Sequence, residues 1–336
     1  MPSLRALLPM GGIVTVAVAM SGCTAPGGSP EEHWSQSKVV FDSERDGNFE
    51  IYVINADGSN QQRLTKWERG DQYPAWTPDG TRIAFTSWGR EDGPRAIFTM
   101  DPDGSNVTRC RSCGSWSPDG KRILFQADDA EDIFIMDADG SNVQRLTTTP
   151  GAGKFSSGGA WSPDGSWIAF SSNRDGDGDT DGDIYVMAAD GSNVKRLTDT
   201  PGKQFSGRPQ WSPDGKWILF ESTRDQDSDK WLEVAELYVM DTDGSNVQRL
   251  TYTTDRGGSF MGVWSPDARK IAFVSGPVAK TQTGDENRRA LVSGDVSRQW
   301  FDSREIYVMD ADGSNVQRLT FNDAFDGHPN WQPARH

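Results

Sequence analysis

Alternating carboxylates give residues 171–183 a clear capacity for metal chemistry. This segment reads SSNRDGDGDTDGD and carries five aspartates at alternate positions: Asp175, Asp177, Asp179, Asp181 and Asp183. Calcium is a hard cation that takes several carboxylate oxygens, and the glycine at 182 permits the sharp turn of a calcium loop. Counted from Asp177, however, the twelfth position is Ala188, where such a loop places a bidentate glutamate. Two interpretations are open: a calcium-binding loop, or a solvated acidic hairpin loop.

A second set of reactive side chains stands a few residues before copies of a tryptophan motif. The set consists of Asp71, Tyr73, Arg208, Asp326 and His328. Their equivalent places predict that they gather around one opening of the fold, where they could hold a ligand. The phenylalanines of the same connections, Phe155, Phe205 and Phe325, are expected to pack in the interior instead.

Several kinds of chemistry are disfavoured. The three histidines, His33, His328 and His336, are spread along the chain, and no G-x-S-x-G nucleophile motif occurs. A net charge of −15 argues against nucleic acid, because binding phosphates needs clustered lysine and arginine. Paired carboxylates for glycoside hydrolysis stay open, since their separations are unknown. We therefore expect no required cofactor, with calcium as the one candidate.

The N-terminus predicts export. Residues 1–22 have a positive Arg5, an apolar run over 6–20, and the ending Met20-Ser21-Gly22. Cys23 follows directly, as in the lipobox of bacterial lipoproteins, and it is the candidate for lipidation. An ordinary cleaved signal with an incidental cysteine is the alternative. The expected product is a lipoprotein that faces the periplasm or the cell exterior and touches the membrane through its lipid alone. Residues 23–33 would be a flexible tether, followed by one folded domain over 34–336.

The remaining cysteines, Cys110 and Cys113, form a C-x-x-C pair. In an exported protein this spacing favours a local disulfide over a redox centre or a zinc site.

The elements that position these residues are repeats. WSPDG occurs at 161–165 and 211–215, with near copies at 76, 116, 264 and 331. Each unit continues with I-x-F, a variable loop, an IYVM-like stretch, a DGSN turn and an R-L-T element. The short apolar stretches, rich in β-branched and aromatic residues, predict four strands, A to D, and the Pro-Asp-Gly and Asp-Gly pairs predict the hairpin turns between them.

Six such units predict an all-β fold, a six-bladed β-propeller of four-stranded antiparallel blades. The tryptophans are expected to pack between neighbouring blades. The first clear strand, at 38–41, is a B strand, so the C-terminal strand with Trp331 is expected to close the ring. Trp34 offers a competing A strand.

The repeat resembles the Pro-Asp variant of WD40-like repeats in the propellers of the TolB family and of prolyl oligopeptidases. The resemblance covers residues 39–333. It implies a periplasmic or cell-envelope protein that binds other proteins, including an extended peptide in its channel.

Meander geometry places the tight A–B and C–D turns on one face, and the variable B–C and D–A connections on the other. The long segment 274–305 belongs to the variable face and could act there as a lid or docking element. Variable loops on a rigid scaffold usually carry binding. We therefore expect a non-catalytic scaffold for an envelope protein or peptide. The alternative is a propeller that binds or acts on carbohydrate, with or without calcium.

The two interpretations of the acidic loop predict different responses to calcium. A bound ion would raise the melting temperature on titration, and Asp179→Ala or Asp181→Ala would abolish that rise. A solvated loop predicts no shift in any of the three proteins, and that result would remove calcium from the account.

Overall fold

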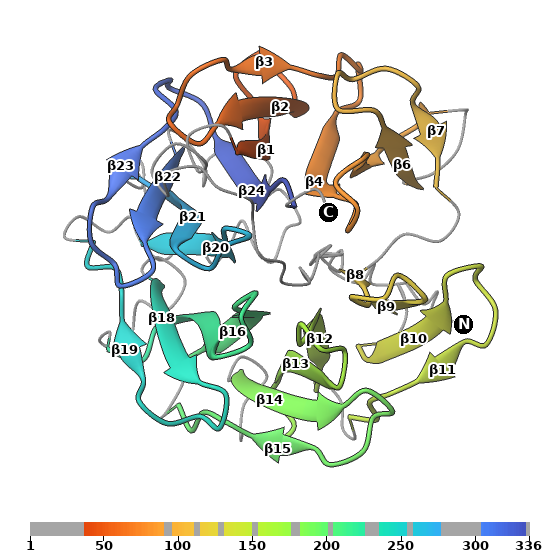
Figure 1. Ribbon diagram of the computed structural model, residues 1–336, viewed down its shortest axis with the longest axis vertical. Helices are drawn as coiled ribbons and strands as arrows, with labels where there is room; N and C mark the ends of the chain where they lie inside the picture. Colours follow the sequence, from red (N-terminus) through yellow and green to blue (C-terminus); the bar gives the residue numbers. More distant parts are fainter. Residues whose placement is uncertain are drawn as a thin grey trace, which may run out of the picture.

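The chain forms a ring of six β-sheets (Figure 1). The computed structural model describes residues 37–90, 96–110, 115–126, 131–149, 154–175, 182–200, 204–225, 235–253, 258–276 and 304–333. Each sheet has four antiparallel strands, which confirms the predicted six-bladed propeller. The described ranges contain no helix, and so none that is long and apolar enough to cross a membrane.

Strands A to D run from the centre of the ring to its rim in every blade. Blade 1 contains β24 (Asp326–Trp331), β1 (Lys38–Ser43), β2 (Glu50–Asn55) and β3 (Gln62–Arg63). Blade 2 contains β4 (Asp71–Trp76), β5 (Ile83–Ser87), β6 (Ala96–Met100) and β7 (Thr108–Arg109). Blade 3 contains β8 (Ser115–Trp116), β9 (Arg122–Gln126), β10 (Ile133–Asp137) and β11 (Gln144–Arg145).

The other three blades follow the same order. Blade 4 contains β12 (Ser156–Trp161), β13 (Trp167–Ser172), β14 (Asp183–Ala188) and β15 (Lys195–Arg196). Blade 5 contains β16 (Ser206–Trp211), β17 (Trp217–Ser222), β18 (Glu236–Asp241) and β19 (Gln248–Arg249). Blade 6 contains β20 (Ser259–Trp264), β21 (Lys270–Ser275), β22 (Glu305–Asp310) and β23 (Gln317–Arg318).

The C-terminal strand closes the ring. In Figure 1 the blue β24 lies beside the red β1. The two strands pair antiparallel, with Val39 opposite Trp331 and Val40 opposite Asn330. The predicted latch is therefore confirmed, and the competing Trp34 lies outside the described residues.

The repeated tryptophans seal the seams between blades. Trp161 and Trp331 are almost fully buried, and each lies in an apolar cluster drawn from two successive blades. The indole N–H of Trp161 donates to the main-chain oxygen of Ser115 in the preceding blade, at 3.1 Å. Trp331 does the same to Val263 at 3.2 Å. The predicted packing between blades is confirmed, because each blade covers the apolar face that its neighbour cannot cover alone.

The R-L-T element closes each blade at its rim by a hydrogen-bonded clamp. In blade 1, Thr65 Oγ1 donates to the buried carboxylate of Glu50 at 2.6 Å and accepts the main-chain N–H of Ile51 at 2.9 Å. Arg63 pairs with the same carboxylate at 2.9 Å. Strand D is consequently two residues long, shorter than expected, because the threonine side chain replaces the next ladder bond.

Four further blades repeat this clamp with Asp132, Asp183, Glu236 and Glu305. Blade 2 lacks both partners of this clamp, the carboxylate that begins strand C and the threonine of the R-L-T element. Its strand C begins at Ala96, and the sequence reads Arg109-Cys110-Arg111 in place of R-L-T.

The glycine of the DGSN turn permits a close approach between blades. Gly244 has φ +93°, and a Cβ built on it would lie 2.7 Å from the main-chain oxygen of Leu197 in the preceding blade. Gly104 and Gly313 face Leu64 and Leu250 in the same way. This turn therefore needs glycine for its backbone conformation and also for space.

We expect Gly244→Ala to destabilise the protein more than Gly47→Ala. Both glycines have φ +93°, but a Cβ on Gly47 meets nothing within 4 Å. The left-handed conformation should cost about 1–2 kcal/mol in each variant, and the clash should add roughly 1–3 kcal/mol in the first alone. Urea unfolding of the two variants measures the difference. Equal losses would show that the seam tolerates a methyl group there.

Candidate functional site

The third residue of strand A is left-handed in five blades. A β-bulge interrupts the pairing of strands A and B at this point, as between Gln72 and Ala75. The residues differ widely in chemistry: Tyr73, Gly158, Arg208, Met261 and His328, with φ between 49° and 69°. Strand A is the innermost strand of each blade (Figure 1), and the strand bounds put these residues near its start. They therefore encircle the channel on the side of the variable loops. We call them the mouth ring.

Hydrogen bonds to the preceding blade hold the mouth ring. The main-chain N–H of Tyr73 donates to Asp42 at 2.9 Å, that of Arg208 to Ser171 at 3.0 Å, and that of Met261 to Glu221 at 2.6 Å. The three acceptors occupy the same place, the fifth residue of strand B. Because each bond crosses a seam, the ring is fixed by the closed propeller and not by any single blade.

His328, Asp42 and Tyr73 form one cluster of the ring. Asp42 is fully buried, and His328 Nδ1 lies 2.9 Å and 3.1 Å from its two carboxylate oxygens. The rings of Tyr73 and His328 meet edge to face, with centroids 4.4 Å apart. Asp42 thus orients the imidazole and leaves Nε2 as the atom that can meet a ligand.

Arg208, Glu221 and Arg304 form a second cluster. Arg208 Nη1 lies 3.6 Å from Glu221 Oε1, and the Arg304 guanidinium lies 4.4 Å from the centre of the Phe260 ring. Burial lowers the pKa of Arg304 to about 10, while the negative charge of Glu221 acts to raise it. Arg304 therefore stays protonated at neutral pH. With Arg208 partly exposed, this side of the mouth presents a cation.

Asp71 and Asp326, predicted near the mouth, are fully buried. Asp326 accepts two hydrogen bonds from Arg45, at 2.7 Å and 2.9 Å, and Asp71 accepts two from Arg90, at 2.6 Å and 3.4 Å. Each arginine also stacks on an aromatic ring, as Arg45 does on Tyr52 at 4.6 Å. These two carboxylates hold the B–C loops to strand A, so they offer little to a ligand.

The acidic loop is described at its two ends. Asp183 is the buried carboxylate of the blade 4 clamp, bonded to Arg196 at 2.6 Å and Thr198 at 2.7 Å. Asp175 accepts the hydroxyl of Tyr185 at 2.9 Å, and burial together with this bond raises the pKa of Tyr185. Asp177, Asp179 and Asp181 lie outside the described residues. Within the described ranges, no group of three or more possible ligands could hold a metal ion.

Cys110 is disulfide-bonded and stands at the end of strand D of blade 2, next to the connection to blade 3. Its expected partner, Cys113, and the lipidation candidate, Cys23, both lie outside the described residues. So does the part of the long loop that covers 277–303.

Sequence reasoning missed Asp42 and Glu221, the acceptors that fix the mouth ring. The sequence did contain a pattern that marks these two carboxylates. Both follow the phenylalanine of strand B directly and precede a serine, within an otherwise buried strand. A carboxylate at such a place needs partners from outside its own strand.

A pocket of about 500 Å³ lies on the same face beside the mouth ring. Phe49 and Trp88 contribute aromatic surface, and Glu68 and Arg69 contribute charge. The residues come from the loops of blades 1 and 2, so the variable face offers a concave surface in addition to the channel mouth.

Comparison with known proteins identifies related propellers. The profile of the family described as TolB beta propeller domain matches residues 8–115 and 177–295, more than half of the chain. The profile described as Tricorn protease N-terminal beta propeller domain matches residues 119–231.

Curated relatives match over shorter segments. An uncharacterised protein of Agrobacterium fabrum is 36% identical over 115 residues, which are 30% of this chain and 38% of that protein. The Tol-Pal system protein TolB of Desulfosudis oleivorans is 41% identical over 64 residues, 19% of this chain and 14% of the relative. The matched segments thus span less than half of these relatives' length.

A solved structure matches over most of the chain. The crystal structure of TolB from Acinetobacter baumannii aligns with a TM-score of 0.66 at 21% identity, covering 90% of this chain and 68% of that one. At this identity, the likeness shows a shared fold.

We expect Asp326→Ala to lower stability strongly, because it leaves the Arg45 guanidinium without its carboxylate partner. Removing one member of a buried ion pair typically costs about 3–5 kcal/mol. Asp323→Ala, at an exposed aspartate three positions earlier, should change stability by less than about 0.5 kcal/mol. Chemical denaturation of both variants tests the structural role. A stable Asp326→Ala protein would contradict the structural role and make Asp326 a candidate for ligand binding again.

Proposed function

Because the chain belongs to the TolB β-propeller family, we propose that it is an exported, lipid-anchored scaffold that binds an envelope protein or an extended peptide at its mouth ring. The proposal needs no catalytic group and no cofactor. The membrane is reached through a lipid on Cys23, and the tether over 23–33 gives the propeller its reach.

The mouth ring is the observation that carries this proposal. Most residues avoid a left-handed backbone, which costs about 1–2 kcal/mol for a non-glycine residue. Blade 4 shows that glycine fits this place, with Gly158 at φ 69°. Four other blades nevertheless carry tyrosine, arginine, methionine and histidine there. A strained backbone conformation that recurs in four blades, with a different side chain in each, is typical of a binding surface.

The chemistry of the ring suits a polypeptide. Tyr73 and His328 offer aromatic edges, Met261 offers an adaptable apolar surface, and Arg208 offers a cation that can pair with a carboxylate. Aromatic, methionine and arginine side chains are enriched in protein interfaces. The adjoining pocket at Phe49 and Trp88 extends the apolar part of this surface.

The test replaces two ring residues by the residue already present in blade 4. The double variant Tyr73→Gly, Arg208→Gly removes their side chains and relieves the left-handed strain, so its free energy of unfolding should stay within about 1 kcal/mol of the parent. Ala268→Gly is the matched control, because Ala268 is also left-handed, with φ 58°, but lies in an A–B turn on the opposite face.

Affinity capture from solubilised envelopes measures binding. We expect the parent and Ala268→Gly to recover one stoichiometric protein, and the double variant to recover at least about tenfold less of it, a loss of ~1.4 kcal/mol. Undiminished recovery by the double variant would contradict the proposal. So would recovery of saccharide without protein.

A further inference from the structure

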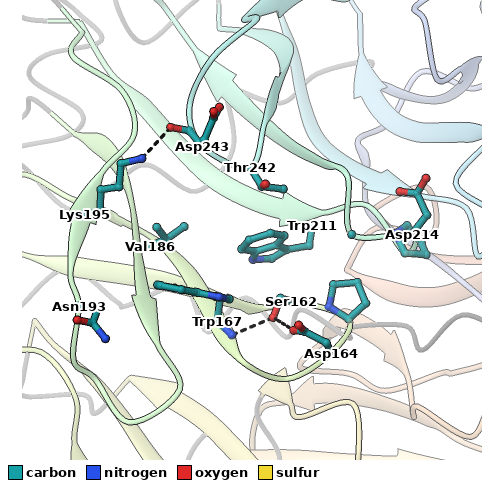
Figure 2. A pocket seen from close by; sticks show the side chains of 13 residues that line it. Ser162, Asp164, Trp167, Val186, Asn193, Lys195, Trp211, Asp214, Thr242 and Asp243 are labelled. Carbon is teal, nitrogen blue, oxygen red and sulfur yellow. Dashed lines mark hydrogen bonds between the residues drawn. The ribbon is translucent and has the colours of Figure 1, made fainter.

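A second pocket lies on the face opposite the mouth ring, between blades 4 and 5. Its volume is about 610 Å³, within the range of small-molecule sites. Figure 2 shows Trp167 and Trp211 presenting their indoles to the same space, with Asn193 and Lys195 on one side and Asp214 on the other. Turns of the same kinds occur in blades 2, 3 and 6, so what is particular to this seam lies in single residues.

The first difference is at the residue that starts strand B. This residue is lysine or arginine in blades 1, 3 and 6 and tryptophan in blades 4 and 5, and in blade 2 the equivalent Arg82 stands directly before the strand. In blade 3 the Arg122 guanidinium lies 4.9 Å from the centre of the Trp161 ring in the next blade, and Trp161 is 1% exposed. In blade 4 the same place carries Trp167, which is 38% exposed.

The facing tryptophan has changed too. Trp211 is partly exposed, and its Nε1 has no hydrogen-bond partner among the described residues, whereas Trp161 uses this atom to bond across its seam. The seam between blades 4 and 5 therefore presents two indoles to a pocket, where the seam between blades 3 and 4 is closed by a cation.

The second difference concerns the side-chain amide of Asn193, which lacks the aspartate partner found in four other blades. In four blades the asparagine of the DGSN turn donates to an aspartate five residues earlier, as Asn246 does to Asp241 at 2.6 Å. Blade 4 has Ala188 at that place, so Asn193 donates instead to the neighbouring Ser192 hydroxyl, at 3.2 Å. Asn193 is exposed and lines the pocket, where its amide can both donate and accept.

The charged groups on the wall are of both signs. Asp164 accepts the Ser162 hydroxyl at 2.6 Å through one oxygen, and this bond lowers its pKa. Asp243 is held in the same way by Ser245. Both are therefore ionised acceptors at neutral pH. Lys195 donates to the main-chain oxygen of Asp243 at 3.1 Å, which holds its ammonium near the pocket (Figure 2).

We propose that this pocket binds a neutral saccharide. The apolar C–H face of a pyranose can pack on an indole, and its hydroxyl groups both donate and accept, as this wall requires. A ligand cation would meet the ammonium of Lys195, and a ligand anion would meet Asp164 and Asp243, so an uncharged ligand fits better. The site is separate from the mouth ring and does not depend on what the ring binds.

Cellobiose and N,N′-diacetylchitobiose are the probes, with binding followed by ligand-observed NMR and calorimetry on the full chain. The parent should bind at least one of them with a dissociation constant of about 1 mM. Trp167→Lys, which installs the residue of blades 1 and 6, should weaken binding at least about tenfold. Trp217→Lys makes the same change in blade 5, at a tryptophan that is 39% exposed and outside this pocket, and should leave binding unchanged.

Ala188→Asp gives a second measurement that does not alter the indoles. It restores the partner that four other blades provide and should draw the Asn193 amide away, weakening binding with the fold intact. Three results would overturn the proposal: neither disaccharide binds the parent, Trp217→Lys weakens binding as much as Trp167→Lys, or tetramethylammonium binds this pocket more tightly than either sugar.

Discussion

A four-stranded sheet with two apolar faces cannot be stable alone in water, and this constraint governs the whole molecule. Each blade is covered by its two neighbours, so the ring must close before every face is buried. The repeated tryptophans and the close approach of glycine to the preceding blade both act at these seams. The main-chain bonds that hold the mouth ring cross the same seams. Blade packing and the geometry of the site therefore have one physical origin.

The seams are not all alike. Apolar clusters of the described residues join blades 1 and 2, 3 and 4, 4 and 5, 5 and 6, and 6 and 1. Within those residues no such cluster joins blades 2 and 3. Blade 2 also lacks the carboxylate and threonine of the rim clamp, and the disulfide-bonded Cys110 stands at this connection. A disulfide-bonded cysteine thus stands where the sequence departs from the common repeat.

The acidic composition has a structural explanation in part. Many carboxylates are committed to repeated roles: the rim clamp, the pairing of B–C loops to strand A, and the serine-capped turns. Their recurrence in blade after blade marks them as part of the scaffold. Departures from the repeat are more informative about binding, because selection for the fold alone would keep the common residue. The mixed residues of the mouth ring, and Trp167 and Ala188 in blade 4, are departures of this kind.

The sequence by itself determined the number of blades, the strand order and the closing strand, because the turn motifs and the tryptophans recur in one linear pattern. It also indicated the part of strand A that lines the channel, and it placed Tyr73, Arg208 and His328 there. It did not separate these from Asp71 and Asp326, whose side chains are buried under Arg45 and Arg90. That distinction depends on which way a side chain points from a bulged strand and on arginine partners in the B–C loop of the same blade. Only the closed ring brings Asp42 to His328, because their paired strands come from opposite ends of the chain. Trp167 and Trp211 meet because blades 4 and 5 pack against each other and the two side chains lie across their seam.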